Sequence, residues 1–169
     1  MITEFWDEDA GGFFFTSNDH EELVVRNKDF YDNATPSGNS VAADVLLRIA
    51  KLTGEEKYER FAVTTLRLAA SQIRRHPQGF GRALSALEFH LGGGNEIAVI
   101  GDTGNDLATF LLQEFRPHDV LVIAQEGAGS MPLLEGRAAI DGQPTAYVCK
   151  DFMCKLPATT VDALRTQLG

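Results

Sequence analysis

Residues 11–40 of this 169-residue chain read GGFFFTSNDHEELVVRNKDFYDNATPSGNS. Gly11-Gly12 predicts the end of a short N-terminal helix, because glycine is costly inside helices and free to adopt positive φ. The aromatic run Phe13 to Phe15 predicts an extended, buried segment. Thr35-Pro36 predicts the start of the next helix, with threonine as the N-cap and proline at the first helical position. The stretch therefore connects two elements that carry apolar residues.

The polar residues of this stretch allow two interpretations. Asp19, His20, Glu21 and Glu22 place three carboxylates beside an imidazole. A solvated loop ahead of a well-capped helix would explain them, since a histidine among carboxylates is often a surface salt-bridge partner. The wall of a pocket would explain them too, because binding pockets combine apolar surfaces with a few placed polar groups.

The composition excludes several classes of partner. Fifteen basic and 24 acidic residues give a net charge of -9, which argues against binding to nucleic acid or to an anionic membrane surface. No apolar run approaches the ~20 residues of a membrane-spanning helix. The N-terminus has neither the basic nor the apolar region of a signal peptide, which predicts a cytoplasmic protein.

The first half of the chain has the periodicity of helices. Helices are predicted over residues 37–53, 58–75 and 80–91. In the first of them, the predicted buried stripe is formed by Val41, Val45, Ile49 and Leu52, with Ala42 and Leu46 beside it. Gly54 is expected at a helix C-cap, and Arg74-Arg75 is expected to complement the end of the second helix.

The second half changes character after a glycine-rich break at residues 92–95. Continuous apolar runs at residues 97–100 and 120–123 predict buried strands, with a helix over residues 103–115 between them. Such a β-α-β unit favours parallel strands. A loop at residues 126–143, a third strand at 145–149 and a closing helix at 157–168 follow. We therefore expect a mainly α protein with a small α/β part, divided into residues 1–94 and 95–169.

The segment GDTGND, residues 101–106, resembles one motif of haloacid-dehalogenase-type phosphatases, in which two aspartates hold Mg²⁺. Asp102 and Asp106 would be the ligands. The DxDxT motif that supplies the nucleophile in those enzymes does not occur here. The alternative is a glycine turn in which Thr103 caps the helix and Asp106 completes a capping box. A dinucleotide site is disfavoured because GxGxxG is missing.

Two cysteines, Cys149 and Cys154, form a C-x4-C pair. A structural zinc site requires four ligands, usually as two close pairs, and the four histidines are scattered. The pair is therefore interpreted as structural thiols or a reversible disulfide. We expect no metal and no cofactor.

The long loop, the helix ending in LTG and the late segment YVCKDFMCKLP, residues 147–157, together resemble the C-terminal part of the DUF255, YyaL-like family of thioredoxin-domain-containing proteins (the spermatogenesis-associated protein 20 type). Members of that family are several times longer. They carry a thioredoxin-like domain followed by an α/α toroid, similar to that of N-acylglucosamine 2-epimerases and six-hairpin glycosidases. The resemblance implies a partial α/α toroid with a β-α-β excursion. It also implies self-association, or association with the N-terminal part of a parent protein.

The resemblance further implies carbohydrate chemistry, which needs a general acid and a general base. The loop before the first long helix would line the cavity, with His20 and Asp32 as catalytic candidates. The candidates for the substrate-binding wall are Phe14, Glu21, Tyr31, Asn33, Ser37 and Asn39.

Three functions stay open at this point. The first is part of a sugar epimerase-like or glycosidase-like enzyme, with a carbohydrate ligand. The second is a non-catalytic binding or structural module that supports a thioredoxin-like domain. The third, and least favoured, is a Mg²⁺-dependent phosphatase.

Overall fold

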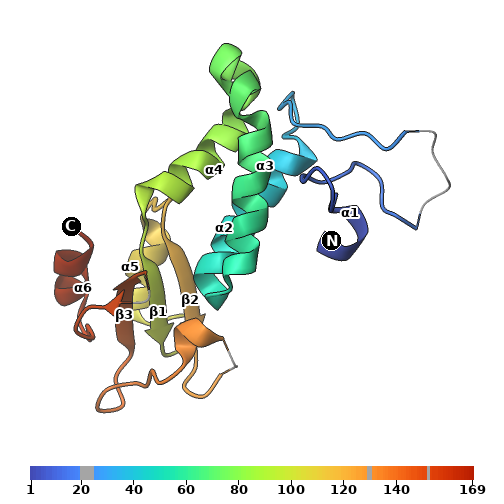
Figure 1. Ribbon diagram of the computed structural model, residues 1–169. Helices are drawn as coiled ribbons and strands as arrows, with labels where there is room; N and C mark the ends of the chain where they lie inside the picture. Colours follow the sequence, from blue (N-terminus) through green and yellow to red (C-terminus); the bar gives the residue numbers. More distant parts are fainter. Residues whose placement is uncertain (20–24, 129–130, 152) are drawn as a thin grey trace. The chain divides into compact units, whose positions relative to one another are not determined.

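The computed structural model describes residues 1–19, 25–128, 131–151 and 153–169. The chain divides into two compact units (Figure 1). The helical unit comprises Met1–Ala50 and Glu55–Leu91, and the sheet unit comprises Lys51–Gly54 and Gly92–Gly169. Two of the predicted site residues, His20 and Glu21, lie outside the described residues.

The helical unit begins with a short helix that an aromatic cluster anchors. Its elements are α1 (Ile2–Phe5), α2 (Gly38–Thr53), α3 (Glu56–Arg75), the 3-10 turn η1 (Pro77–Gly79) and α4 (Gly81–Gly92). The last residues of α2, from Lys51, and of α4, Gly92, belong to the sheet unit. The Trp6 ring meets Phe13 edge-on with centroids 5.0 Å apart, and meets Phe61 of α3 at 4.6 Å. Such edge-to-face pairs favour a fixed geometry. They tie the beginning of the chain to a long helix, although α1 alone is too short to be stable.

The start of α2 differs from the prediction. Ser37, and not Thr35, is the capping residue: its Oγ accepts from the backbone N–H of Ser40 at 3.1 Å, and its carbonyl accepts from Val41 N–H. Thr35 and Pro36 precede the helix in irregular backbone. A serine two residues further on can satisfy the same free N–H groups, so the sequence alone did not distinguish the two caps.

The buried face of α2 is also shifted from the prediction. Val41 and Val45 are 38% and 40% exposed, whereas Ala43, Leu46 and Leu47 are buried. Apolar residues occur almost all round this segment, so the helical period offered more than one stripe. The predicted ends are confirmed: Gly54 follows α2 with φ of +69°, and two arginines occupy the last turn of α3.

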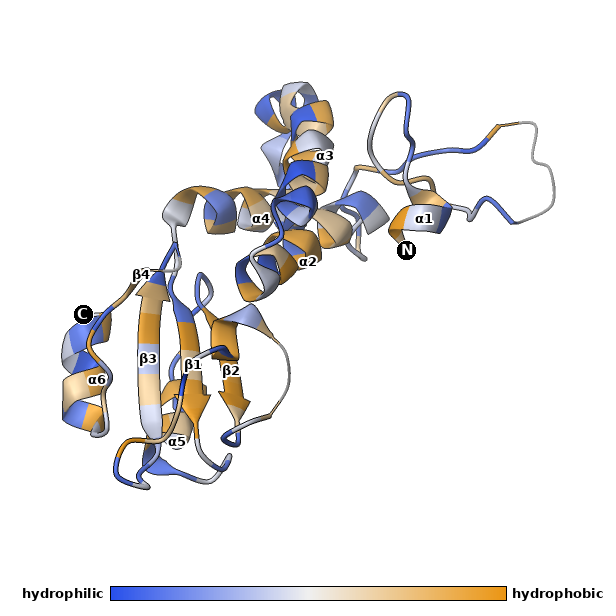
Figure 2. Cartoon of the chain, turned by 60° about the horizontal axis from the view of Figure 1, so that its bottom comes forward, coloured by the Kyte–Doolittle hydropathy of each residue, from blue (hydrophilic) through white to orange (hydrophobic). Residues whose placement is uncertain are grey.

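The sheet unit contains four strands in the order β2-β1-β3-β4. They are β1 (Glu96–Ile100), β2 (Val120–Ala124), β3 (Thr145–Lys150) and β4 (Met153–Cys154). β1 and β2 are parallel, which confirms the β-α-β prediction, and β3 runs antiparallel to both β1 and β4. The strands lie side by side in Figure 2, with α5 and α6 beside them.

Both faces of the central strand are covered, so every residue of β1 is buried. Helices α5 (Asp106–Gln113) and α6 (Val161–Leu168) share one apolar core with the sheet, made by Ile97, Val99, Leu107, Leu111, Ala146, Val148, Ala158 and Leu164. The 3-10 turn η2 (Pro132–Leu134) contacts β1, and its Leu133 is fully buried. This double coverage is why the strand reads as a continuous apolar run.

The two helices of the sheet unit are shorter than predicted. α5 begins at Asp106 with Asn105 as its N-cap, whose Oδ1 accepts from Ala108 N–H at 2.9 Å; Thr103 is not the cap. α6 begins only at Val161, because Ala158 pairs with Ala146 of β3. The residues that precede each helix are held by turn or strand hydrogen bonds instead.

Since the described residues form both helices and a four-stranded sheet, the chain is a mixed α/β protein. Among the described residues no helix is both long enough and apolar enough to span a bilayer.

Candidate ligand-binding pocket

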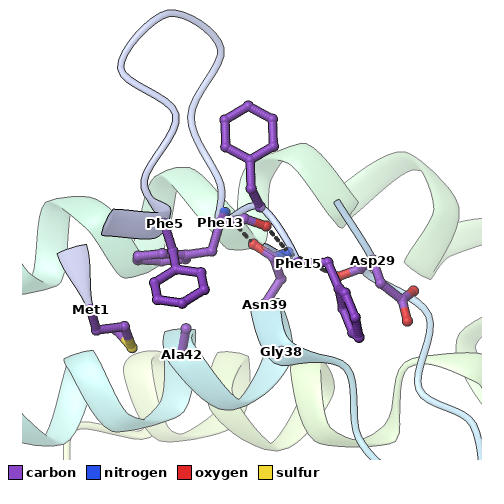
Figure 3. A pocket seen from close by; sticks show the side chains of 9 residues that line it. Met1, Phe5, Phe13, Phe15, Asp29, Gly38, Asn39 and Ala42 are labelled. Atoms are coloured by element: carbon purple, nitrogen blue, oxygen red, sulfur yellow. Dashed lines mark hydrogen bonds between the residues drawn. The ribbon is translucent and has the colours of Figure 1, made fainter. Parts of the chain in front are cut away.

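The helical unit contains a pocket of about 250 Å³ where the Phe13–Phe15 run meets the start of α2. Met1, Phe5 and Ala42 lie on one side of it, and Phe15 and Asp29 lie on the other (Figure 3). The residues that line it are Met1, Phe5, Phe13, Phe14, Phe15, Asp29, Gly38, Asn39 and Ala42. Aromatic walls with a single carboxylate at the rim match the general character of small-ligand sites.

Asn39 holds the two sides of this pocket together. Its Oδ1 accepts from Phe13 N–H at 2.7 Å, and its Nδ2 donates to the carbonyls of Phe13 and Asp29 at 2.8 and 2.9 Å. The side chain lies in the first turn of α2 and is 2% exposed. Because both amide donors already serve the backbone, Asn39 shapes the pocket rather than offering its amide N–H groups to a ligand.

The exposed aromatic ring of the pocket is Phe15, which the sequence analysis had expected to be buried. Phe15 is 76% exposed. Phe14, the predicted stacking surface, is covered: the Arg26 guanidinium lies 4.1 Å and the Lys28 ammonium 4.9 Å from its ring centroid. These cation–π contacts cover the face of the Phe14 ring that a ligand would need for stacking. Phe15 therefore replaces it as the ring to which a ligand has access.

Asp32, one of the two predicted catalytic residues, is a capping residue in the structure. Its Oδ1 accepts from Ser37 N–H at 2.8 Å, just before α2. Its Oδ2 accepts from the N–H groups of Arg82 and Ala83, at 2.8 and 3.2 Å, in the first turn of α4. One carboxylate thus satisfies free donors at the N-termini of two helices, where a negative charge is also favourable.

The other predicted wall residues lie apart from the pocket. Tyr31 packs edge-on against Phe80 with centroids 5.4 Å apart. Ser37 is buried, with its Oγ 2.8 Å from Ser40 Oγ. Asn33 is exposed, and its backbone N–H donates to the Thr35 carbonyl. Of the predicted set, the structure brings Phe14 and Asn39 to the pocket, and it adds Asp29.

A second polar contact holds the loop in place. Lys28 donates to the Asp7 carboxylate and to the Gly11 carbonyl. The hydrogen bond from Lys28, with backbone N–H groups of the 7–10 turn, lowers the pKa of Asp7 from 3.8 to about 2. A carboxyl group whose pKa is lowered by folding stabilises the fold only while it is ionised.

We therefore expect Lys28→Met to destabilise the protein most above about pH 4, with the part of the difference that depends on Asp7 disappearing as the pH falls toward 2. The unfolded carboxyl group takes up its proton near pH 4 and the folded one near pH 2, so stability is lost in that window. Urea unfolding at several pH values measures it. Lys57→Met, which removes an exposed lysine paired with Glu55, is the matched control. A Lys28→Met effect that persists unchanged at pH 2 would contradict the expectation.

The GDTGND segment, residues 101–106, which resembles a phosphatase motif, forms a turn. Asp102 Oδ1 accepts from Gly104 N–H at 2.9 Å, and Asp106 is the first residue of α5. In the part of the chain that the structure describes, no three metal-binding side chains of the His, Cys, Asp or Glu type cluster together. The other predicted pair, Cys149 and Cys154, forms a disulfide between β3 and β4.

Comparison with known proteins finds that this chain is similar in sequence to part of several long animal proteins. No family model matches the sequence. A human protein is 33% identical over 97% of the chain, and its mouse counterpart is 30% identical over the same share. The chain is similar to Spermatogenesis-associated protein 20. An uncharacterized protein of Caenorhabditis elegans is 26% identical over 95% of the chain.

The similarity to Spermatogenesis-associated protein 20 spans nearly the whole chain. The chain in turn spans 22% of the length of the human relative. This agrees with the type of protein that the loop and the YVCKDFMCKLP segment predicted.

Proposed function

We propose that this chain forms a carbohydrate-binding wall within a protein of the Spermatogenesis-associated protein 20 type. The observation that carries the proposal is the pocket at the start of α2, which presents an exposed Phe15 ring and an exposed Asp29 at one rim. Sugar rings present apolar C–H faces together with hydroxyl groups. A ring for stacking beside a carboxylate for hydrogen bonding suits both features.

The carboxylate of Asp29 has capacity for such a ligand. Its Oδ1 accepts from Tyr31 N–H at 3.0 Å, whereas an ionised carboxylate can accept about four hydrogen bonds. The rigid Asn39 contacts fix Asp29 and Phe13 at the same time. A wall held in this way loses little conformational freedom when a ligand binds.

We further propose that the helical unit is part of a larger α/α toroid, as the sequence resemblance implied. The chain matches only about a fifth of its long relatives, so other segments of such a protein would complete the cavity. Any catalytic acid or base would come from His20 or from those segments, because Asp32 already serves two helix ends. The predicted self-association stays a prediction.

The only tryptophan reports on the pocket. Trp6 packs on Phe13, which lines it. We expect its fluorescence to change on titration with monosaccharides, and Phe15→Ala and Asp29→Asn each to weaken binding by about tenfold, or about 1.4 kcal/mol. The stacking surface is lost in the first variant and the charged acceptor in the second.

Two controls separate this pocket from nonspecific effects. Phe115→Ala removes an even more exposed phenylalanine from the sheet unit, and Asp162→Asn removes an exposed carboxylate there. Both should bind sugar like the original chain. The proposal fails if no sugar changes the signal at millimolar concentration. It also fails if a hydroxyl-free aromatic compound binds equally well and Asp29→Asn has no effect.

A further inference from the structure

The Cys149–Cys154 disulfide of the sheet unit joins two sulfurs of unequal accessibility. Cys149 lies in β3 directly opposite Cys154 of β4, five residues later. Cys149 is 1% exposed, whereas Cys154 is exposed on a strand of two residues. A nucleophile that approaches from solvent therefore meets Cys154 first. Access is one of the factors that decides which sulfur of a disulfide is attacked.

A guanidinium group lies against both sulfurs. Arg137 Nη2 is 3.0 Å from Cys149 Sγ and 3.1 Å from Cys154 Sγ. The same side chain donates to the Leu133 carbonyl, and its guanidinium carbon lies 5.5 Å from the Tyr147 ring centroid. Leu133 is fully buried and Tyr147 belongs to β3, so Arg137 is held at the sulfurs by the sheet and by η2.

This placement is poorly explained by the neutral disulfide alone. Burial lowers the pKa of Arg137, and the nearby Tyr147 and Glu96 offset only part of that effect. A disulfide sulfur is only a weak hydrogen-bond acceptor and repays little of that cost. A thiolate at the same position would attract the guanidinium strongly, because charge-assisted contacts are about twice as strong as neutral ones. The guanidinium therefore lies where it would stabilise a cysteine thiolate. The buried Glu96 carboxylate, which faces Cys149 across the strand pair, has its own cationic partner in Lys51 at 3.0 Å.

We propose that Cys149–Cys154 is a site of reversible thiol–disulfide exchange with a small-molecule thiol, attacked at Cys154, with Arg137 stabilising the Cys149 thiolate that leaves. An external thiolate attacks Cys154 Sγ; the bond between the two cysteine sulfurs breaks, and its electron pair goes to Cys149. A second external thiolate then attacks the external sulfur of this mixed disulfide and releases Cys154 as a thiolate.

The two steps balance as a two-electron exchange. Two external thiols lose their protons and are oxidised to one external disulfide. The protein disulfide is reduced to two cysteines, which take up protons according to their pKa values. Reoxidation follows the same path in reverse. Arg137 is a positioning and charge-stabilising residue in both directions. On reduction, a better-stabilised leaving thiolate departs faster; on reoxidation, Arg137 raises the fraction of Cys149 that is present as the attacking thiolate.

The rate of reduction by glutathione tests the role of Arg137. The oxidised chain is mixed with excess reduced glutathione, quenched with acid, and followed by intact mass. We expect Arg137→Gln to slow loss of the disulfide by about tenfold. Lys155→Gln is the control, because it also removes one positive charge next to Cys154. The Lys155 ammonium group donates to the Gln167 carbonyl. Its rate should match the original chain.

The direction of the effect separates chemistry from loss of structure. A variant that merely loosens the strand pair would expose the disulfide and speed its reduction, so a rate for Arg137→Gln equal to or above the original overturns the proposal. Circular dichroism confirms that each variant is folded.

The position of the mixed disulfide gives a second, independent readout. Peptide mapping of the trapped intermediate should find glutathione on Cys154; finding it on Cys149 overturns the proposed order. In the variant Cys154→Ser, the rate of Cys149 alkylation against pH reports the pKa of that thiol. Adding Arg137→Gln should move this profile to higher pH by about one unit. An unmoved profile overturns the role of Arg137.

Discussion

Gly94→Ala is expected to destabilise the protein by about 3 kcal/mol, because a Cβ atom at this position would overlap the backbone carbonyl of His118. Neither backbone segment can withdraw easily. Asn95 N–H donates to Asp119 at 2.7 Å, and Val120 N–H donates to the Asn95 carbonyl at 2.9 Å. These bonds set the register in which Glu96 of β1 faces Val120 of β2. Making room for a methyl group would disturb the parallel strand pair.

Thermal unfolding measures this effect, and a loss of about 6–12 °C is expected for a chain of this size. Gly92→Ala is the matched control, two residues away. Its Cβ would make only ordinary contacts, at 3.6 Å or more, with the His118 ring. Because alanine also restricts the unfolded chain, this control should change stability by less than about 1 kcal/mol. Equal melting temperatures for the two variants would show that the close approach at Gly94 does not exist in solution.

Asp32→Ala is the second large expected effect, a loss of about 3 kcal/mol of unfolding free energy. The substitution leaves three backbone N–H groups, of Ser37, Arg82 and Ala83, without their acceptor. Replacing a single N-cap usually costs about 1 kcal/mol, and here one carboxylate serves two helix starts. Asp32→Asn keeps one oxygen and should lose roughly half as much.

Urea unfolding distinguishes this structural role from the catalytic one that the sequence suggested. Asp29→Asn, an exposed aspartate three residues earlier in the loop, is the control and should unfold at nearly the same urea concentration as the original chain. If Asp32→Ala leaves the unfolding midpoint unchanged, the capping role is wrong. Asp32 would then be available again as an acid or base.

The strands of the sheet unit were the part of the fold that the sequence predicted best. Residues 97–100 and 120–123 are apolar without alternation, which is the pattern of strands buried on both faces. Their link through a helix then favoured parallel pairing, and the structure has it. What the pattern could not supply is the cover on the second face: Leu133 comes from a loop with little regular structure, and its burial depends on where that loop returns to β1.

The sequence predicted the segment that forms the pocket but not which of its side chains are exposed. The sequence singled out the polar loop and the aromatic run, yet Phe14 is covered and Phe15 is exposed. The distinction depends on Arg26 and Lys28, which follow more than ten residues later and turn back onto the Phe14 ring. No local propensity encodes that return. Likewise, Asp32 reaches α4 across 50 residues of sequence.

The amino-acid sequence by itself determined the helices of the first half, the β-α-β unit of the second and the end of α2 at Gly54. These depend on local propensity, hydrophobic period and short sequence separation. Tertiary structure alone decided which face of α2 is buried, that Asn39 joins two backbone segments and that Arg137 lies on the disulfide. Those features arise from contacts between residues distant in sequence, whose partners are chosen only when the chain packs.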